Sequence, residues 1–130
     1  MCLPSLLKIQ NYTIKKEGMI YMFTIIEIKG QEYKLRLRTV DVVQLEKKLG
    51  HSLMDVFMGM QDEKIPQLRE LLAILHASMA AYNHGINEAK FYELYDAYIE
   101  DGHNMFDLIP IILELMQNGG IIPKDNAPVE

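Results

Sequence analysis

The side chains in this sequence that could do chemistry do not fall into a catalytic pattern. His76 and Ser78 lie two positions apart in a stretch with helical periodicity, so their side chains diverge by roughly 200° and cannot act as a dyad. The only cysteine, Cys2, lies near the start of the chain, where no activated site is expected. The four histidines lack the spacing of metal ligands: His51, His76, His84 and His103. We therefore expect no catalytic residues, metal or cofactor, and a protein that is not an enzyme.

Acidic side chains gather in the stretch from Glu88 to Asp101. Glu93, Asp96 and Glu100 could suggest metal binding or acid–base catalysis. No second cluster complements them, and the 12-residue ligand pattern of a calcium loop is missing. A solvated helix face is the better interpretation.

A row of basic side chains lies between residues 32 and 38. Lys34, Arg36 and Arg38 alternate with apolar residues, which predicts a strand with one buried and one basic face. The row could contact phosphate, or it could be a charged edge that prevents aggregation. Residues 61–130 carry twelve Asp/Glu against four Lys/Arg, which makes nucleic acid an unlikely partner for the helices.

Methionine is unusually frequent, with nine residues and no tryptophan. Met is flexible and polarisable, and it is over-used on surfaces that bind varied apolar partners. In the predicted helix from Leu53 to Met60, Phe57 lies on the inward face, while Met54 and Met58 lie on a different side. This flank is either a second core contact or, with Phe57, a partner-binding patch.

The last predicted helix, Leu108 to Met116, is apolar nearly all round. Such a helix is buried on several sides by its own chain, or it is shared with a partner. The candidate partner contacts on this helix are Ile109, Ile112, Leu113 and Met116.

These residues must be positioned by a hairpin and a set of helices. Two strands are predicted over Phe23 to Ile28 and Glu32 to Arg38, joined by a turn at Lys29 to Gln31. Five stretches have helical periodicity or helix caps. They cover Val40 to Leu49, Leu53 to Met60, Ile65 to Tyr82, Glu88 to Asp101, and a last helix starting near Met105 to Asp107. The expected fold class is α+β: an N-terminal β-hairpin followed by a mainly α-helical bundle of about five helices, with Ile65 to Tyr82 as the central helix.

The length of 130 residues predicts one domain, which we place at residues 22–120. Residues 1–21 are interpreted as a flexible leader or a mis-annotated start, with an extra strand around Tyr12 to Ile14 as the alternative. Residues 121–130 are expected to form a disordered tail. No apolar run is long enough to span a membrane, and the single cysteine fits a reducing cytoplasm.

Several segments together resemble a known family. Residues 30–37 read Gly-Gln-Glu-Tyr-Lys-Leu-Arg-Leu, residues 45–50 Leu-Glu-Lys-Lys-Leu-Gly, and residues 52–57 Ser-Leu-Met-Asp-Val-Phe. Residues 68–78 read Leu-Arg-Glu-Leu-Leu-Ala-Ile-Leu-His-Ala-Ser, and an acidic helix with Tyr-Glu-Leu-Tyr-Asp-Ala-Tyr-Ile-Glu-Asp-Gly follows. From about Phe23 to Gly120, this arrangement resembles the tail assembly chaperones of long-tailed phages and prophages of Gram-positive bacteria.

The resemblance implies a function without catalysis. Such chaperones coat apolar segments of the tape measure protein in the host cytoplasm, commonly self-associate as homo-oligomers, and are displaced by tail tube protein. Two alternatives stay open. One is a small structural protein of the virion, in the tail or head–tail connector. The other is a nucleic-acid-binding regulator that uses the basic hairpin.

Overall fold

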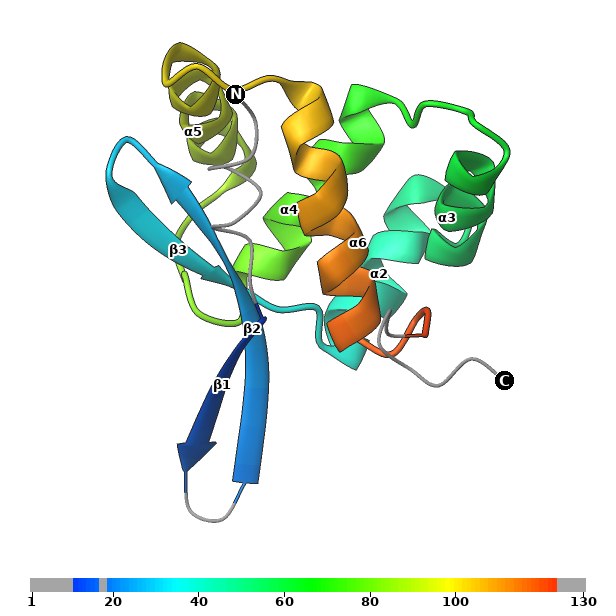
Figure 1. Cartoon of the computed structure of the whole chain (residues 1–130), viewed down its shortest axis with the longest axis horizontal. Coiled ribbons are helices and arrows are strands. Elements are labelled where there is room, and N and C mark those ends of the chain that lie inside the picture. Colours follow the sequence, from blue (N-terminus) through cyan, green and yellow to red (C-terminus); the bar gives the residue numbers. More distant parts are fainter. Residues whose placement is uncertain (1–10, 17–18, 124–130) are drawn as a thin grey trace.

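The computed structural model describes the backbone of residues 11–16 and 19–123, and the side chains of residues 23–123. Three strands, β1 (Asn11–Lys16), β2 (Met19–Ile28) and β3 (Gln31–Leu35), form an antiparallel sheet in the order β1-β2-β3 (Figure 1). Five α-helices follow in the described part of the chain, with a 3-10 turn, η1 (Met105–Asp107), before the last. They are α2 (Thr39–Leu49), α3 (Leu53–Gln61), α4 (Leu68–Met79), α5 (Glu88–Glu100) and α6 (Leu108–Asn118). The predicted α+β class, a hairpin followed by five helices, is confirmed.

The β2–β3 hairpin is closed by a two-residue turn. Lys29 and Gly30 both have positive φ, 53° and 80°, which is the requirement of the tight turn that best matches the twist of a hairpin. Ile28 then pairs with Gln31, and the register continues to Thr24 opposite Leu35. The turn therefore fixes which residues of β3 face the helices: Leu35 is fully buried and Glu32 is exposed.

Strand β2 is long enough to pair with a different neighbour along each half. Residues 24–28 pair with β3, and residues 19–24 pair with β1. The strand considered around Tyr12 to Ile14 is present as β1, at the end of β2 that projects away from the helices (Figure 1). The position of the natural start remains a prediction.

Four predicted element boundaries are wrong by three residues or more. Strand β2 begins at Met19 rather than Phe23. Strand β3 ends at Leu35 rather than Arg38. The central helix α4 begins at Leu68 rather than Ile65, because a carboxylate oxygen of Glu70 accepts the backbone N–H of Gln67 at 3.2 Å and so makes Gln67 the N-cap. Pro66 consequently precedes the helix. At its other end α4 stops at Met79, three residues before Tyr82.

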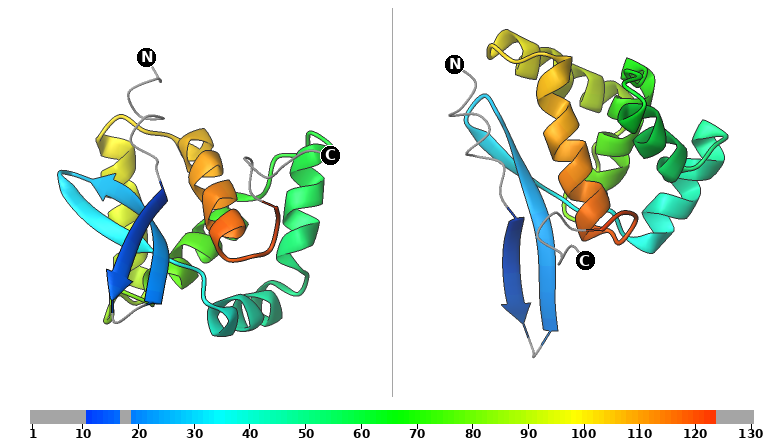
Figure 2. Two further views of the ribbon diagram at one scale, coloured as in Figure 1. Left: turned by 60° about the horizontal axis from the view of Figure 1, so that its bottom comes forward. Right: turned by 45° about the vertical axis from the view of Figure 1, so that its right-hand side comes forward.

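Helix α6 packs against both the sheet and the neighbouring helix α4. It contacts β2 on one side and α4 on another, and the two views of Figure 2 show it in this position. Five of its eleven residues are buried and none is exposed before Gly119. The α6 start agrees with the range predicted from the sequence. Asp107 is the N-cap, and Pro110 occupies the third helical position, where a missing N–H has no helical partner to lose.

The domain continues past the predicted boundary at Gly120. The backbone N–H of Ile121 donates to the carbonyl of Met116 at 2.9 Å, and Ile122 is buried in the core. The first residues of the predicted tail are therefore packed, because two consecutive isoleucines bury apolar surface against the end of α6. Residues 124–130 of that tail lie outside the described residues.

Replacing Leu75 with alanine is expected to lower the free energy of unfolding by about 2–5 kcal/mol, because a fully packed leucine leaves a cavity. Leu75 is 2% exposed in the middle of α4. Urea denaturation followed by circular dichroism measures the loss.

The matched control is Leu68→Ala in the first turn of the same helix, where the side chain is 38% exposed. It should cost less than about 1 kcal/mol. Equal losses at the two positions would contradict the assignment of α4 as the core support.

Candidate functional site

Helix α3 is held in place at its N-terminus by two side chains. Ser52 Oγ accepts the backbone N–H of Asp55 at 3.0 Å, and a Glu46 carboxylate oxygen accepts the backbone N–H of Leu53 at 2.8 Å. Leu53 and Val56 are buried on its inner face. The helix is therefore anchored to the fold through one face only.

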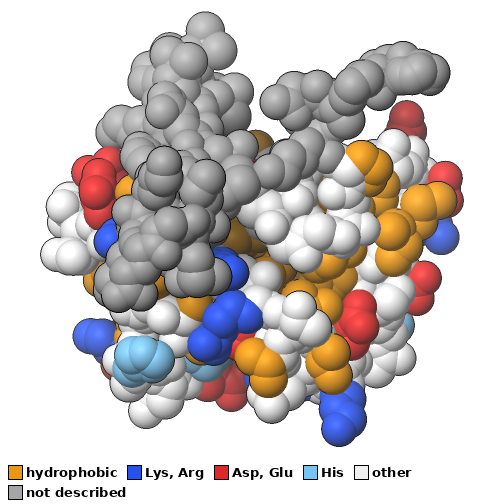
Figure 3. Space-filling view, turned by 90° about the horizontal axis from the view of Figure 1, so that it is seen from below, with side chains coloured by type: hydrophobic (Ala, Val, Ile, Leu, Met, Phe, Trp, Pro, Cys, Tyr) orange, Lys and Arg blue, Asp and Glu red, His pale blue; other side chains and the backbone are white. Residues whose placement is uncertain are grey.

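The opposite face of α3 presents methionine to solvent. Met54 and Met58 are 41% and 53% exposed and lie one helical turn apart, so they are not the second core contact that was one reading of the sequence. Phe57 is half-buried between the two faces. We call Met54, Phe57 and Met58 the Met surface. In the view from below, hydrophobic side chains are exposed on the right-hand side of the molecule, where α3 lies (Figure 3).

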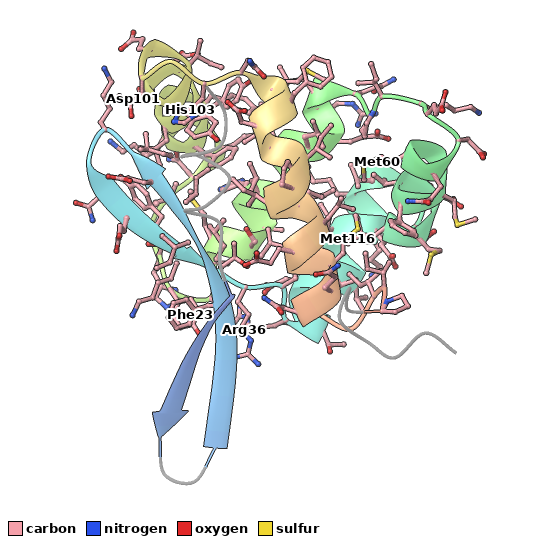
Figure 4. All side chains as sticks on the ribbon, in the orientation of Figure 1. Phe23, Arg36, Met60, Asp101, His103 and Met116 are labelled. Carbon is pink, nitrogen blue, oxygen red and sulfur yellow. The ribbon has the colours of Figure 1, made fainter. Side chains whose placement is uncertain are left out.

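Two of the four candidate partner contacts on α6 are buried in the core. Ile112 and Met116 have no exposed surface, whereas Ile109 and Leu113 are half-buried. The prediction of a partner-binding role for Ile112 and Met116 is wrong, because both side chains are fully buried in the core. Figure 4 shows Met116 on α6 and Met60 on α3 between the two helices, where both belong to the core.

The predicted basic face does not form one row along a strand. Lys34 Nζ lies 5.2 Å from the ring centroid of Phe23 and 5.8 Å from that of Tyr82, within the range of cation–π attraction. Arg38 makes two hydrogen bonds to the Asp41 carboxylate, at 2.9 and 3.0 Å. Arg36 follows the end of β3 and donates its backbone N–H to the carbonyl of Ser78 at 2.8 Å (Figure 4). Lys34 and Arg38 thus already have partners within the protein.

A polar cluster between β2 and α6 was not foreseen from the sequence. The fully buried Thr24 donates its hydroxyl to Glu114 at 2.9 Å, and the Asn118 amide donates to Thr24 Oγ1 at 3.4 Å. Burial raises the pKa of Glu114, and the hydrogen bond from Thr24 offsets part of that effect. The available signal was Glu114 itself, the one acidic residue in an otherwise apolar helix.

The histidines serve as structural links rather than as a cluster. His51 Nε2 lies 2.7 Å from Glu70, and His103 Nδ1 lies 3.2 Å from Asp107. Within residues 11–16 and 19–123, no group of three or more His, Cys, Asp or Glu side chains could hold a metal ion. None of the helices in this part of the chain is long and apolar enough to cross a membrane.

The fold is that of a small α+β protein, and Met54 and Met58 on α3 are among its exposed apolar side chains. The family comparison places it more closely: the chain belongs to a family of unknown function, DUF6096, whose model matches residues 21–128. Comparison with curated proteins and with solved structures found no match.

Replacing Glu114 with glutamine is expected to raise the melting temperature at pH 7. The raised pKa means that folding favours the protonated carboxyl, so Glu114 contributes stability below its ordinary pKa and loses that contribution as pH rises through the folded-state pKa. Glutamine keeps an acceptor for Thr24 without the buried charge. Thermal unfolding from pH 4 to 8 measures the difference.

Glu93→Gln, in an exposed position on α5, is the control and should leave the pH dependence unchanged. A Glu114→Gln variant that melts at lower temperature at every pH would show that the charge is compensated in the fold.

Proposed function

We propose that this protein is a phage tail assembly chaperone that binds apolar segments of a tape measure protein without catalysis. The observation that carries the proposal is the exposure of Met54 and Met58 on a helix whose other face is anchored in the core. The family-level resemblance of the sequence from Phe23 to Gly120 supplies the identity of the partner, and it keeps the tail tube protein as the competitor that displaces the chaperone.

The chemistry of the Met surface suits a chaperone. Thioether side chains have three rotatable bonds and adapt to differently shaped apolar groups, so one surface can follow a long partner of varied sequence. No unique residue in the partner is required, which agrees with the lack of a sharp motif in this chain.

The expected strength of binding is modest. Burial of a few hundred Å² of apolar surface at about 25 cal/mol per Å² supplies roughly 5–10 kcal/mol. Lost rigid-body freedom and side-chain ordering offset much of this gain. Contacts of this size are reversible, as a chaperone must be if another protein is to displace it.

A nucleic-acid-binding role has less support. The phosphate-binding candidates Lys34 and Arg38 are engaged with aromatic rings and with Asp41. A protein that binds phosphates needs cations that are free to displace the counterions condensed on the nucleic acid.

Met54→Asp and Met58→Asp are expected to weaken binding of an apolar tape measure fragment by at least tenfold while leaving the melting temperature within a few degrees of wild type. A charge at the centre of an apolar contact must be desolvated on binding, whereas on the free protein it stays in water. Co-expression of the full chain with the tape measure fragment, followed by affinity capture and titration, measures the effect.

Ile99→Asp is the matched control, since Ile99 is also 40% exposed but lies on α5. It should bind like wild type. Two results would overturn the proposal: wild-type protein that leaves the fragment unbound, or Asp variants at 54 and 58 that bind as well as wild type. A protein found in finished virions would favour the structural alternative.

A further inference from the structure

A hollow of about 180 Å³ opens between α2, α4 and α5, away from the residues of the Met surface. We call it the α4–α5 hollow. Its lining residues come from three helices: Lys48 and Leu49 on α2, Arg69, Leu72, Ala73 and His76 on α4, and Glu88, Phe91 and Tyr92 on α5.

The hollow follows from helical spacing and from one small residue. The α4 contributors recur at i, i+3, i+4 and i+7, and the α5 contributors at i, i+3 and i+4, so each helix offers a single face. Ala73 leaves space where a larger side chain would fill the gap between the faces. Leu49, Leu72 and Phe91 are buried and make the base apolar.

The acidic group in the hollow is already neutralised by its neighbours. Tyr92 Oη donates to a Glu88 carboxylate oxygen at 3.0 Å, and Lys48 Nζ lies 3.5 Å from the same oxygen. The hydrogen bond from Tyr92 and then the charge of Lys48 lower the pKa of Glu88, so it is ionised at neutral pH. Lys48 and Glu88 thus form a pair within the wall.

Lys48 and Glu88 offset each other, so the uncompensated positive charge at the hollow is that of Arg69. Its guanidinium donates to the neutral amide oxygen of Gln67 at 3.3 Å, and its side chain is exposed. His76 Nε2 lies 2.7 Å from the carbonyl oxygen of Ile86, which can only accept, so this nitrogen carries a hydrogen and donates. With Lys48 and Glu88 paired, the hollow has an apolar base and the exposed guanidinium of Arg69 at its rim.

We propose that the α4–α5 hollow binds a segment of a partner protein that presents an apolar side chain next to a carboxylate. A cavity of about 150 Å³ holds benzene, so the hollow has room for one leucine, methionine or phenylalanine side chain. Arg69 provides the fork-shaped donor that matches a carboxylate.

The rim favours a protein over a free small molecule. Arg69 and Tyr92 are both exposed at its edge, and arginine and tyrosine are among the residues that carry most of the energy at protein interfaces. The site is independent of the proposed chaperone function, because none of its lining residues lies on α3. The protein would then hold partners at two places of different chemistry.

The test is a titration of the 15N-labelled full chain with N-acetyl-leucyl-glutamate amide, followed by amide chemical shifts. Millimolar binding is expected, with the largest shifts around Lys48, Ala73 and Tyr92. N-acetyl-leucyl-glutamine amide should bind at least threefold more weakly, and N-acetyl-leucyl-lysine amide should produce no saturable shift. A peptide of this kind measures the recognition chemistry apart from any particular partner.

Two variants test the charge at the rim and the volume of the hollow separately. Arg69→Gln should weaken the acidic probe at least fivefold and leave the neutral probe unchanged, whereas Ala73→Leu should abolish the binding of both. Their controls are Lys47→Gln, beside Lys48 but outside the hollow, and Ala89→Leu, on an exposed position of α5; both should behave as wild type. The fold of each variant is checked by its amide spectrum.

Three results would overturn the proposal. They are equal shifts with acidic, neutral and basic probes, shifts that map outside the hollow, and an Arg69→Gln variant that binds like wild type. A second copy of this chain could also present an apolar side chain next to a carboxylate, because Met54 precedes Asp55 on α3. Sedimentation experiments would then show self-association that depends on concentration and that Arg69→Gln abolishes. That result would assign the hollow to contact between two copies instead.

Discussion

The packing of α6 between the sheet and α4 is the constraint on which the rest of the structure depends. A helix that is apolar on nearly every side must be covered on every side, and here β2 supplies one cover and α4 another. This arrangement constrains the positions of the other elements. The hairpin has to lie against α6, and α2, α4 and α5 have to be arranged around the hairpin and α6. The Thr24–Glu114 hydrogen bond accommodates the one acidic side chain of α6, which is partly buried beside β2. Because Ile112 and Met116 are buried within the chain, only the half-buried Ile109 and Leu113 remain as candidate partner contacts on α6.

Much of the fold could be predicted from the sequence because its signals are local. The Lys29–Gly30 turn lies where it was expected, and the caps at Ser52 and Asn87 and the glycine after α2 each act within a few residues. The errors came from positions where a contact that periodicity does not describe decides the boundary. Arg38 continues the alternation of β3, yet it leaves the strand because its backbone N–H and its guanidinium both bind the Asp41 carboxylate at the start of α2. Ile122 follows two glycines and still packs, because the end of α6 offers an apolar surface that the sequence does not reveal.

For the candidate site, too, periodicity in the sequence could not reveal which residues other elements cover. Periodicity separated Met54 and Met58 from the inner face of α3, but it could not say whether a second layer of protein covered them; their exposure decides this. For α6, periodicity gave apolar residues all round and no preferred side, so exposed and buried members could not be told apart. The α4–α5 hollow was beyond the sequence altogether. Ala73 is an ordinary small helix residue until the neighbouring faces of α2 and α5 are known.

The two surfaces differ in what they can discriminate. The Met surface offers adaptable apolar contact without a charged group of its own, so it tolerates many sequences and rejects few. The α4–α5 hollow combines a limited volume with the uncompensated charge of Arg69. A partner without a carboxylate at that point leaves this charge unpaired. A protein that used both would gain adaptability from one contact and orientation from the other. Binding at a second place on the same partner also becomes intramolecular, so two weak contacts can give useful occupancy while each remains separately reversible. This combination suits a protein that must cover a long apolar chain and later be removed from it.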